Sequence, residues 1–172
     1  SRGCPYRCSF CQVTMQPDVV RIRTKVDDDL TYLISNYNPG FIHFVDELIP
    51  YYDDKWRDSW GRFKHPFIAY IRADIPEKWL IWLKDRGLSG CFFGVESGNE
   101  DYRNKVLGKN LLDKDIIRTV ALLKEMEIPF MASYMRGTPG ESWEMQAQTM
   151  ALSKILGGYP VFYQYEKIIG SS

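Results

Sequence analysis

The chain has 172 residues, of which 45% are apolar and 26% charged, a composition typical of one globular domain. Lys plus Arg and Asp plus Glu each number 22, so the net charge is zero and does not indicate a nucleic-acid partner. No apolar run approaches the roughly 20 residues that cross a bilayer, and the N-terminus lacks a secretory pattern. We therefore expect no membrane partner and a reducing, cytoplasmic location.

Helical and strand patterns alternate along the chain. An apolar stripe at helical spacing follows the acidic run Asp27–Asp29, which suits a helix N-terminus, and Pro39-Gly40 ends it. Short apolar runs followed by polar residues indicate strands buried on both faces. The expected strands are 41–45, 67–71, 90–95, 130–135 and 161–165. The expected helices are 26–37, part of 53–63, 76–87 with Gly87 as its cap, 113–127 and 141–156.

Five strands separated by helices long enough for crossover connections predict an α/β fold with a parallel sheet. The carboxyl ends of parallel strands meet at one edge, where ligands bind in such sheets. The polar residues expected to converge on this edge are Asp46, Glu47, Arg72, Glu96, Ser97 and Arg136. No repeat, low-complexity tract or linker divides residues 1–172, so we predict a single domain.

The cysteines are distributed unevenly, because Cys4, Cys8 and Cys11 lie together and Cys91 lies alone. Disulfides between such close positions would constrain the chain little, so the cluster predicts a metal site. A structural zinc ion requires four protein ligands, and Cys91, His43 and His65 are unproven candidates for the fourth. Three thiolates can instead hold an iron–sulfur cluster and leave one iron open to another ligand.

The spacing C-x-x-x-C-x-x-C, with Phe10 before the last cysteine, resembles the cluster loop of the radical S-adenosylmethionine (radical SAM) superfamily. Gly94–Gly98 with Asn104–Lys109, and the turn 135–141, resemble the branch of cobalamin-dependent, elongator-like and methylthiotransferase enzymes. The resemblance covers almost the whole chain and implies a partial (β/α)6 TIM-like barrel with parallel strands. We therefore expect the first strand and the C-terminal part of the barrel to lie outside this sequence, which we interpret as a fragment of a larger protein.

By this resemblance, Cys4, Cys8 and Cys11 are the ligands of a [4Fe-4S] cluster whose open iron binds SAM. One electron from an external donor then cleaves SAM to a 5′-deoxyadenosyl radical. The residues that the resemblance and the strand ends place near SAM are Phe10, Asp46, Glu47, Arg72, Glu96, Ser97, Arg136 and Gly137. No catalytic residue beyond these is assigned.

Several of these positions have a second interpretation. Glu96 either accepts hydrogen bonds from SAM or is a structural carboxylate. Asp46-Glu47 departs from the Gly-Gly-Glu stretch of many superfamily members and is also suited to cap the following helix. Arg72 pairs either with the SAM carboxylate through its planar fork or with Asp74 or Glu96. Cys91 is expected to be a small buried thiol.

The resemblance implies a radical SAM enzyme core used for cobalamin-dependent methylation or rearrangement. An RNA-modifying methylthiotransferase is a second hypothesis. A non-catalytic iron–sulfur or zinc-binding module is a third. The sequence does not specify the substrate, small or macromolecular, because loops and flanking domains would select it.

Overall fold

A five-stranded parallel sheet forms the centre of the computed structural model, which describes residues 1–15, 20–61 and 63–166. The strands are β1 (Ile42–His43), β2 (Phe67–Tyr70), β3 (Leu88–Glu96), β4 (Phe130–Arg136) and β5 (Tyr159–Gln164). Their order in the sheet is their order in the sequence, and all neighbouring pairs are parallel. The sheet is a half-barrel, which confirms the predicted α/β class and partial barrel.

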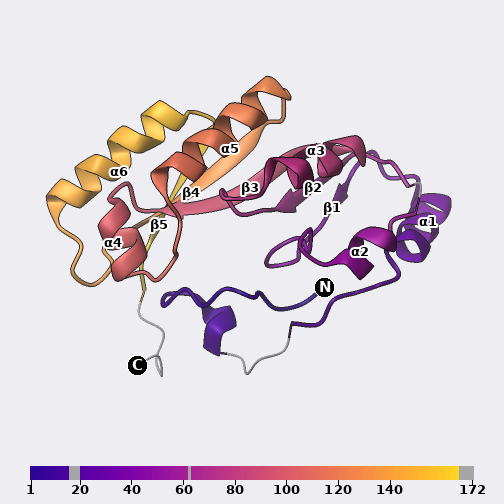
Figure 1. Cartoon of the computed structure of the whole chain (residues 1–172), viewed down its shortest axis with the longest axis horizontal. Coiled ribbons are helices and arrows are strands. Elements are labelled where there is room, and N and C mark those ends of the chain that lie inside the picture. The colour runs from indigo at the N-terminus through magenta and orange to yellow at the C-terminus, as the bar shows by residue number, and fades with distance from the viewer. Residues whose placement is uncertain (16–19, 62, 167–172) are drawn as a thin grey trace.

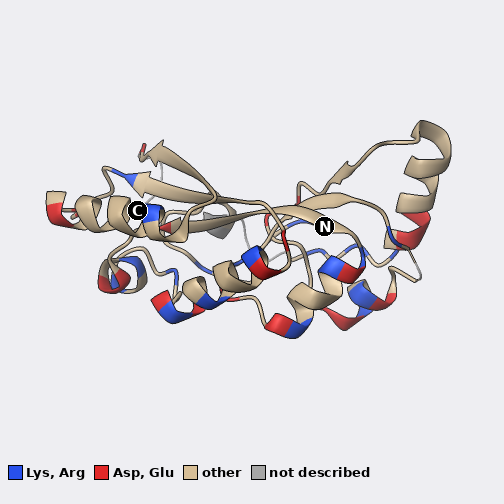
Figure 2. Cartoon of the chain, turned by 90° about the horizontal axis from the view of Figure 1, so that it is seen from above, with Lys and Arg blue, Asp and Glu red and all other residues tan. Residues whose placement is uncertain are grey.

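The helices lie mainly on one face of the sheet (Figures 1 and 2). They are η1 (Gln12–Met15), α1 (Val26–Tyr37), α2 (Asp54–Asp58), α3 (Glu77–Asp85), α4 (Glu100–Lys105), α5 (Asp113–Glu125) and α6 (Trp143–Leu156). Basic and acidic residues are intermixed along several of the helices, whereas the charged residues of α1 are all acidic (Figure 2). Within the described ranges, no helix has the length and apolar character needed to cross a membrane.

The core lies between the sheet and the covering helices. Alternate strand residues point toward α3 and α5, whose apolar stripes face back onto the sheet, as expected for amphipathic elements. The fully or almost fully buried members of this layer are Phe67, Ala69, Phe93, Val95, Ala132, Tyr134, Leu80, Leu83, Ile116 and Leu123. The packed layer fixes the strands, and therefore fixes where the chain leaves the carboxyl edge of the sheet.

Several elements differ from the sequence-based prediction. The strand expected at 41–45 is reduced to the two residues of β1, and the helix expected within 53–63 is the short α2. The pattern did not predict α4, which begins after Asn99, whose side chain accepts a hydrogen bond from the Tyr102 amide at 2.7 Å. Helix α1 has the predicted bounds. Its C-terminal cap is Asn38, in the left-handed conformation, so the helix stops before it reaches Pro39-Gly40.

Candidate functional site

The end of β3 carries a buried ion pair at the carboxyl edge of the sheet. Lys109 Nζ donates to Glu96 Oε1 at 2.6 Å, and both side chains are buried. The register between β3 and β4 shifts between Gly94 and Glu96, and Glu96 has a φ of 68°, which is rare for a residue with a side chain. A Cβ at Gly94 would lie 1.9 Å from Glu96 Oε1 and 2.7 Å from Lys109 Nζ. The ion pair therefore requires glycine at position 94.

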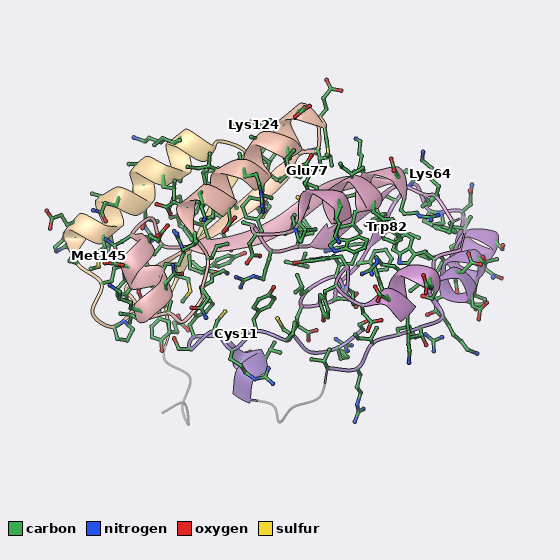
Figure 3. All side chains as sticks on the ribbon, in the orientation of Figure 1. Cys11, Lys64, Glu77, Trp82, Lys124 and Met145 are labelled. Carbon is green, nitrogen blue, oxygen red and sulfur yellow. The ribbon has the colours of Figure 1, made fainter. Side chains whose placement is uncertain are left out.

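The loop that carries the three clustered cysteines contacts the segment after α4. Cys8 is buried, while Cys4 and Cys11 are partly buried, and none of the chain's cysteines forms a disulfide. Ser9 is the contact residue, because its amide donates to the Leu107 carbonyl at 3.1 Å and its hydroxyl to the Val106 carbonyl at 3.0 Å. Figure 3 places Cys11 on the N-terminal segment beside η1.

Two cations share the surroundings of these thiols. Burial raises the pKa of Cys8, and the charges of Lys109 and Arg72 oppose this increase. Burial also raises the pKa of Cys4, with Lys109 and Arg72 again acting in the opposite direction. The thiols also influence one another, so the three sulfurs and two cations form one neighbourhood. Such a setting favours a group bound through thiolates, whose negative charge the cations partly neutralise.

The arrangement fits a cluster better than a single zinc ion. In the part of the chain that the structure describes, no three His, Cys, Asp or Glu side chains converge on one metal-ion position. The candidates for a fourth zinc ligand have other surroundings: Cys91 is buried in β3, His43 stacks on Tyr70, and His65 Nε2 lies 2.9 Å from the Pro39 carbonyl. Three separated thiols suit a four-iron cluster, in which each thiolate binds a different iron.

Asp46 and Glu47 follow β1 and lie beside the start of the cysteine loop. Glu47 Oε2 accepts a hydrogen bond from the Gly3 amide at 3.0 Å, and the Asp46 carboxylate contacts the Ser1 nitrogen. The interpretation of this pair as a helix cap is wrong. Asp53 caps α2, since its carboxylate accepts a hydrogen bond from the Trp56 amide at 2.8 Å.

Arg72 follows β2 and forms an ion pair with Asp74, one of the two carboxylates that the sequence suggested as its partners. Its Nε and Nη2 each donate to the Asp74 carboxylate at 2.9 Å. Glu96 pairs with Lys109 instead. Burial has the largest effect on the pKa of the Arg72 guanidinium and lowers it. The ion pair with Asp74 acts in the opposite direction, and the net result is a raised pKa.

The remaining predicted positions line the same edge of the sheet. Phe10 lies near the ion pair, with its ring centroid 5.7 Å from Lys109 Nζ. Ser97 is buried and its hydroxyl accepts a hydrogen bond from the Asn99 amide at 3.2 Å. Arg136 is exposed at the end of β4, and Gly137 follows it with a φ of 72°. Sequence reasoning did not single out Lys109, although it lies in the stretch that carries the family resemblance, because no local pattern reveals its partner.

The sequence profile of the radical SAM superfamily matches residues 1–152. An uncharacterized methyltransferase of Pyrococcus horikoshii is 26% identical in an alignment of length 166 that covers 91% of this chain and 36% of that protein.

Two radical SAM enzymes of known structure share the fold. The methyltransferase TsrM from Kitasatospora setae, solved with cobalamin and a [4Fe-4S] cluster, superposes with a TM-score of 0.78 at 19% identity, covering 94% of this chain and 32% of TsrM. The coproporphyrinogen III oxidase HemN from Escherichia coli gives 0.70 at 16% identity, covering 98% of this chain and 43% of HemN. The chain thus spans less than half the length of these relatives. With a family match over most of its length and a half-barrel fold, the chain belongs to the radical SAM superfamily.

Proposed function

We propose that this chain is the cofactor-binding core of a radical SAM enzyme that carries out methyl transfer as part of a larger protein. The observation that carries the proposal is that two buried cations, Lys109 and Arg72, act on the thiols of the cysteine loop at the carboxyl edge of a parallel sheet. This edge is where side chains from several strands converge in barrel enzymes. We therefore infer that the reactive group is a ligand bound across the strand ends, beside Cys4, Cys8 and Cys11.

Cys4, Cys8 and Cys11 would hold a [4Fe-4S] cluster through their thiolates. When bound, the cluster and SAM supply a one-electron reductive cleavage that yields a 5′-deoxyadenosyl radical, with the electron coming from an external donor. The protein binds, orients and shields these groups. A reducing cytoplasm would keep the thiols available for the cluster.

Glu96 is the strongest candidate among this chain's residues for holding SAM. Its backbone is held at a positive φ, and strain of this kind is concentrated at functional sites. Its second carboxylate oxygen can accept a hydrogen bond from a hydroxyl or ammonium group while Oε1 binds Lys109. Phe10 would pack against the adenine end, and Asp46, Glu47, Ser97, Arg136 and Gly137 would complete the edge.

Methyl transfer and cobalamin enter the proposal through the relatives. The Pyrococcus protein is described as a methyltransferase, and TsrM is a methyltransferase that binds cobalamin. In our proposal cobalamin would be bound by a part of the protein outside these residues, and the substrate would be selected there too. The relatives described above favour methyl transfer over methylthiolation.

Replacement of a cluster ligand tests the proposal. Anaerobic reconstitution with iron and sulfide, followed by one-electron reduction with dithionite to the paramagnetic +1 state, should give a wild-type cluster whose electron paramagnetic resonance spectrum changes when SAM is added. Cys8→Ala should lose the cluster, because two thiolates and solvent hold it poorly. Cys91→Ala is the control, since Cys91 is also buried but packs in the core, and it should retain a SAM-responsive cluster. A SAM-responsive cluster in Cys8→Ala would contradict the ligand assignment.

A further inference from the structure

Two arginine side chains hold the segment 106–111, which we call the Lys109 segment, through hydrogen bonds to its backbone carbonyls. Arg72 Nη2 donates to the carbonyls of Lys109 at 3.0 Å and Asn110 at 3.1 Å. Arg103 Nε donates to the Leu111 carbonyl at 2.8 Å. Three consecutive carbonyls are therefore fixed by guanidinium groups, and the segment has a defined position relative to the sheet.

Arg72 also contacts the cysteine loop. Its guanidinium carbon lies 3.8 Å from the centre of the Tyr6 ring, between Cys4 and Cys8 in sequence. The same guanidinium holds the Asp74 carboxylate at the end of β2, and Arg72 is only 7% exposed. One side chain therefore joins the cysteine loop, the Lys109 segment and the sheet.

Only arginine has the shape for these contacts. Its planar fork places several donors in fixed directions, and its flat face stacks on an aromatic ring. A lysine at position 72 would keep the positive charge but would lose the parallel contacts and the stacking on Tyr6. The contacts already made by Arg72 also point away from a role in binding the SAM carboxylate.

We propose that Arg72 is a positioning residue that fastens the cysteine loop to the Lys109 segment before any cluster binds. It fixes the thiols and the Lys109 ammonium in one arrangement, so the cluster assembles on a preformed loop. The inference rests on the proposed function for the identity of the bound group. The fastening of the two segments is a property of the metal-free protein and can be tested there.

Amide hydrogen exchange of the metal-free protein is the first test. In Arg72→Met, the amides of Ser9, Cys11 and Leu111, which donate hydrogen bonds in the structure, should exchange at least about tenfold faster. Arg72→Lys should not restore their protection. Arg86→Met is the matched control, because Arg86 also contacts a carbonyl, that of Gly61, and an aromatic ring, that of Trp82, but lies away from the cysteine loop. Equal exchange in Arg72→Met and Arg86→Met would overturn the inference.

Tyr6→Leu provides a second variant if Arg72→Met folds poorly. It removes the stacking on Arg72 and the side-chain hydrogen bond between Tyr6 and Tyr51, but it leaves the hydrogen bonds of Arg72 to the Lys109 segment. Ser9 and Cys11 should therefore lose protection while Leu111 keeps it. Unchanged exchange at Ser9 and Cys11 would count against the fastening role.

The reconstituted protein separates positioning from direct SAM binding. If Arg72 positions the loop, Arg72→Met should release iron to a chelator about 10- to 100-fold more readily than wild type. If Arg72→Met retains iron and loop protection but loses the spectral response to SAM, Arg72 contacts SAM and the inference fails. A wild-type protein that binds no cluster would contradict the proposed function, whereas the exchange test would still decide the fastening role.

Discussion

At the scale of single residues, Gly94 shows how one missing side chain makes room for two buried charges. The Glu96 carboxylate and Lys109 ammonium occupy the space that a Cβ at position 94 would need. Removing a charged group from water is costly unless it is paired, so Glu96 and Lys109 depend on each other. The glycine therefore controls the geometry of the ion pair at the proposed SAM site.

Gly94→Ala should displace this ion pair. The added methyl group overlaps Glu96 Oε1, and separating a buried pair lowers the free energy of unfolding by about 3 kcal/mol. Urea unfolding measures the loss, and equilibrium dialysis of the reconstituted protein should show weaker SAM binding. Gly90→Ala in the same strand is the control, because its Cβ would lie 3.1 Å from the Ile68 side chain and 3.6 Å from the Pro129 carbonyl oxygen, with no charged group among these neighbours. Equal effects of the two substitutions would argue against a special role for position 94.

Tyr134 and Tyr102 form a contrasting pair of buried phenols. The Tyr134 hydroxyl has no hydrogen-bond partner among the described residues, whereas the Tyr102 hydroxyl bonds to Thr138 Oγ1 at 2.6 Å and to the Pro139 carbonyl at 2.8 Å. Tyr134→Phe should leave the free energy of unfolding unchanged or higher, and Tyr102→Phe should lower it by about 1–2 kcal/mol. Thermal or urea unfolding at neutral pH checks both. A larger loss for Tyr134→Phe would refute this reading.

The same tyrosine predicts a pH dependence. Burial raises the pKa of Tyr134 to about 12, so the folded protein retains a proton that the unfolded chain releases near its ordinary pKa of 10.0. Below pH 10 this group adds no pH dependence to the free energy of unfolding, which falls as the pH rises from 10 toward 12 because only the unfolded chain releases the proton. The Tyr134→Phe variant should therefore lose stability less steeply than wild type over this interval, as measured by urea unfolding at each pH.

At the scale of elements, the long segments were predictable and the short ones were not. The bounds of α1 followed from its apolar stripe and acidic first turn. Helix α4 was missed because Tyr102 and Arg103 are its only buried residues, and no apolar stripe marks it. The strand β1 has only two residues, so its length depends on pairing with β2 rather than on its own sequence.

Arg103 provides the test at this scale, because it fixes α4 against the start of α5. Its side chain is 0% exposed and donates to the Ser97 carbonyl at 2.8 Å and to Asp113 at 2.6 Å. Arg103→Met should lower the free energy of unfolding by about 3–5 kcal/mol, since it leaves buried acceptors unpaired. Arg118→Met is the control: Arg118 is exposed and also donates to a carbonyl, that of Ile75, so it should cost less than about 1 kcal/mol. Equal losses would show that Arg103 has no special structural role.

At the scale of the whole molecule, the sequence predicted the half-barrel and the cysteine loop but only part of the site around them. The loop was recognisable because its spacing is local. The partner of Lys109 and the stacking of Tyr6 on Arg72 depend on contacts between separate segments, which periodicity does not encode. No pattern in residues 1–172 specifies a substrate, and the chain covers 36% of the length of its Pyrococcus relative.

We propose that three thiolates hold the cluster and leave one of its irons open to SAM. Mössbauer spectroscopy of protein reconstituted anaerobically with isotopically enriched iron measures this directly, because each iron contributes its own signal. We predict that adding SAM shifts the signal of one iron and leaves the others unchanged. A spectrum that does not change with SAM, or a single metal ion bound by four protein side chains, would contradict this proposal.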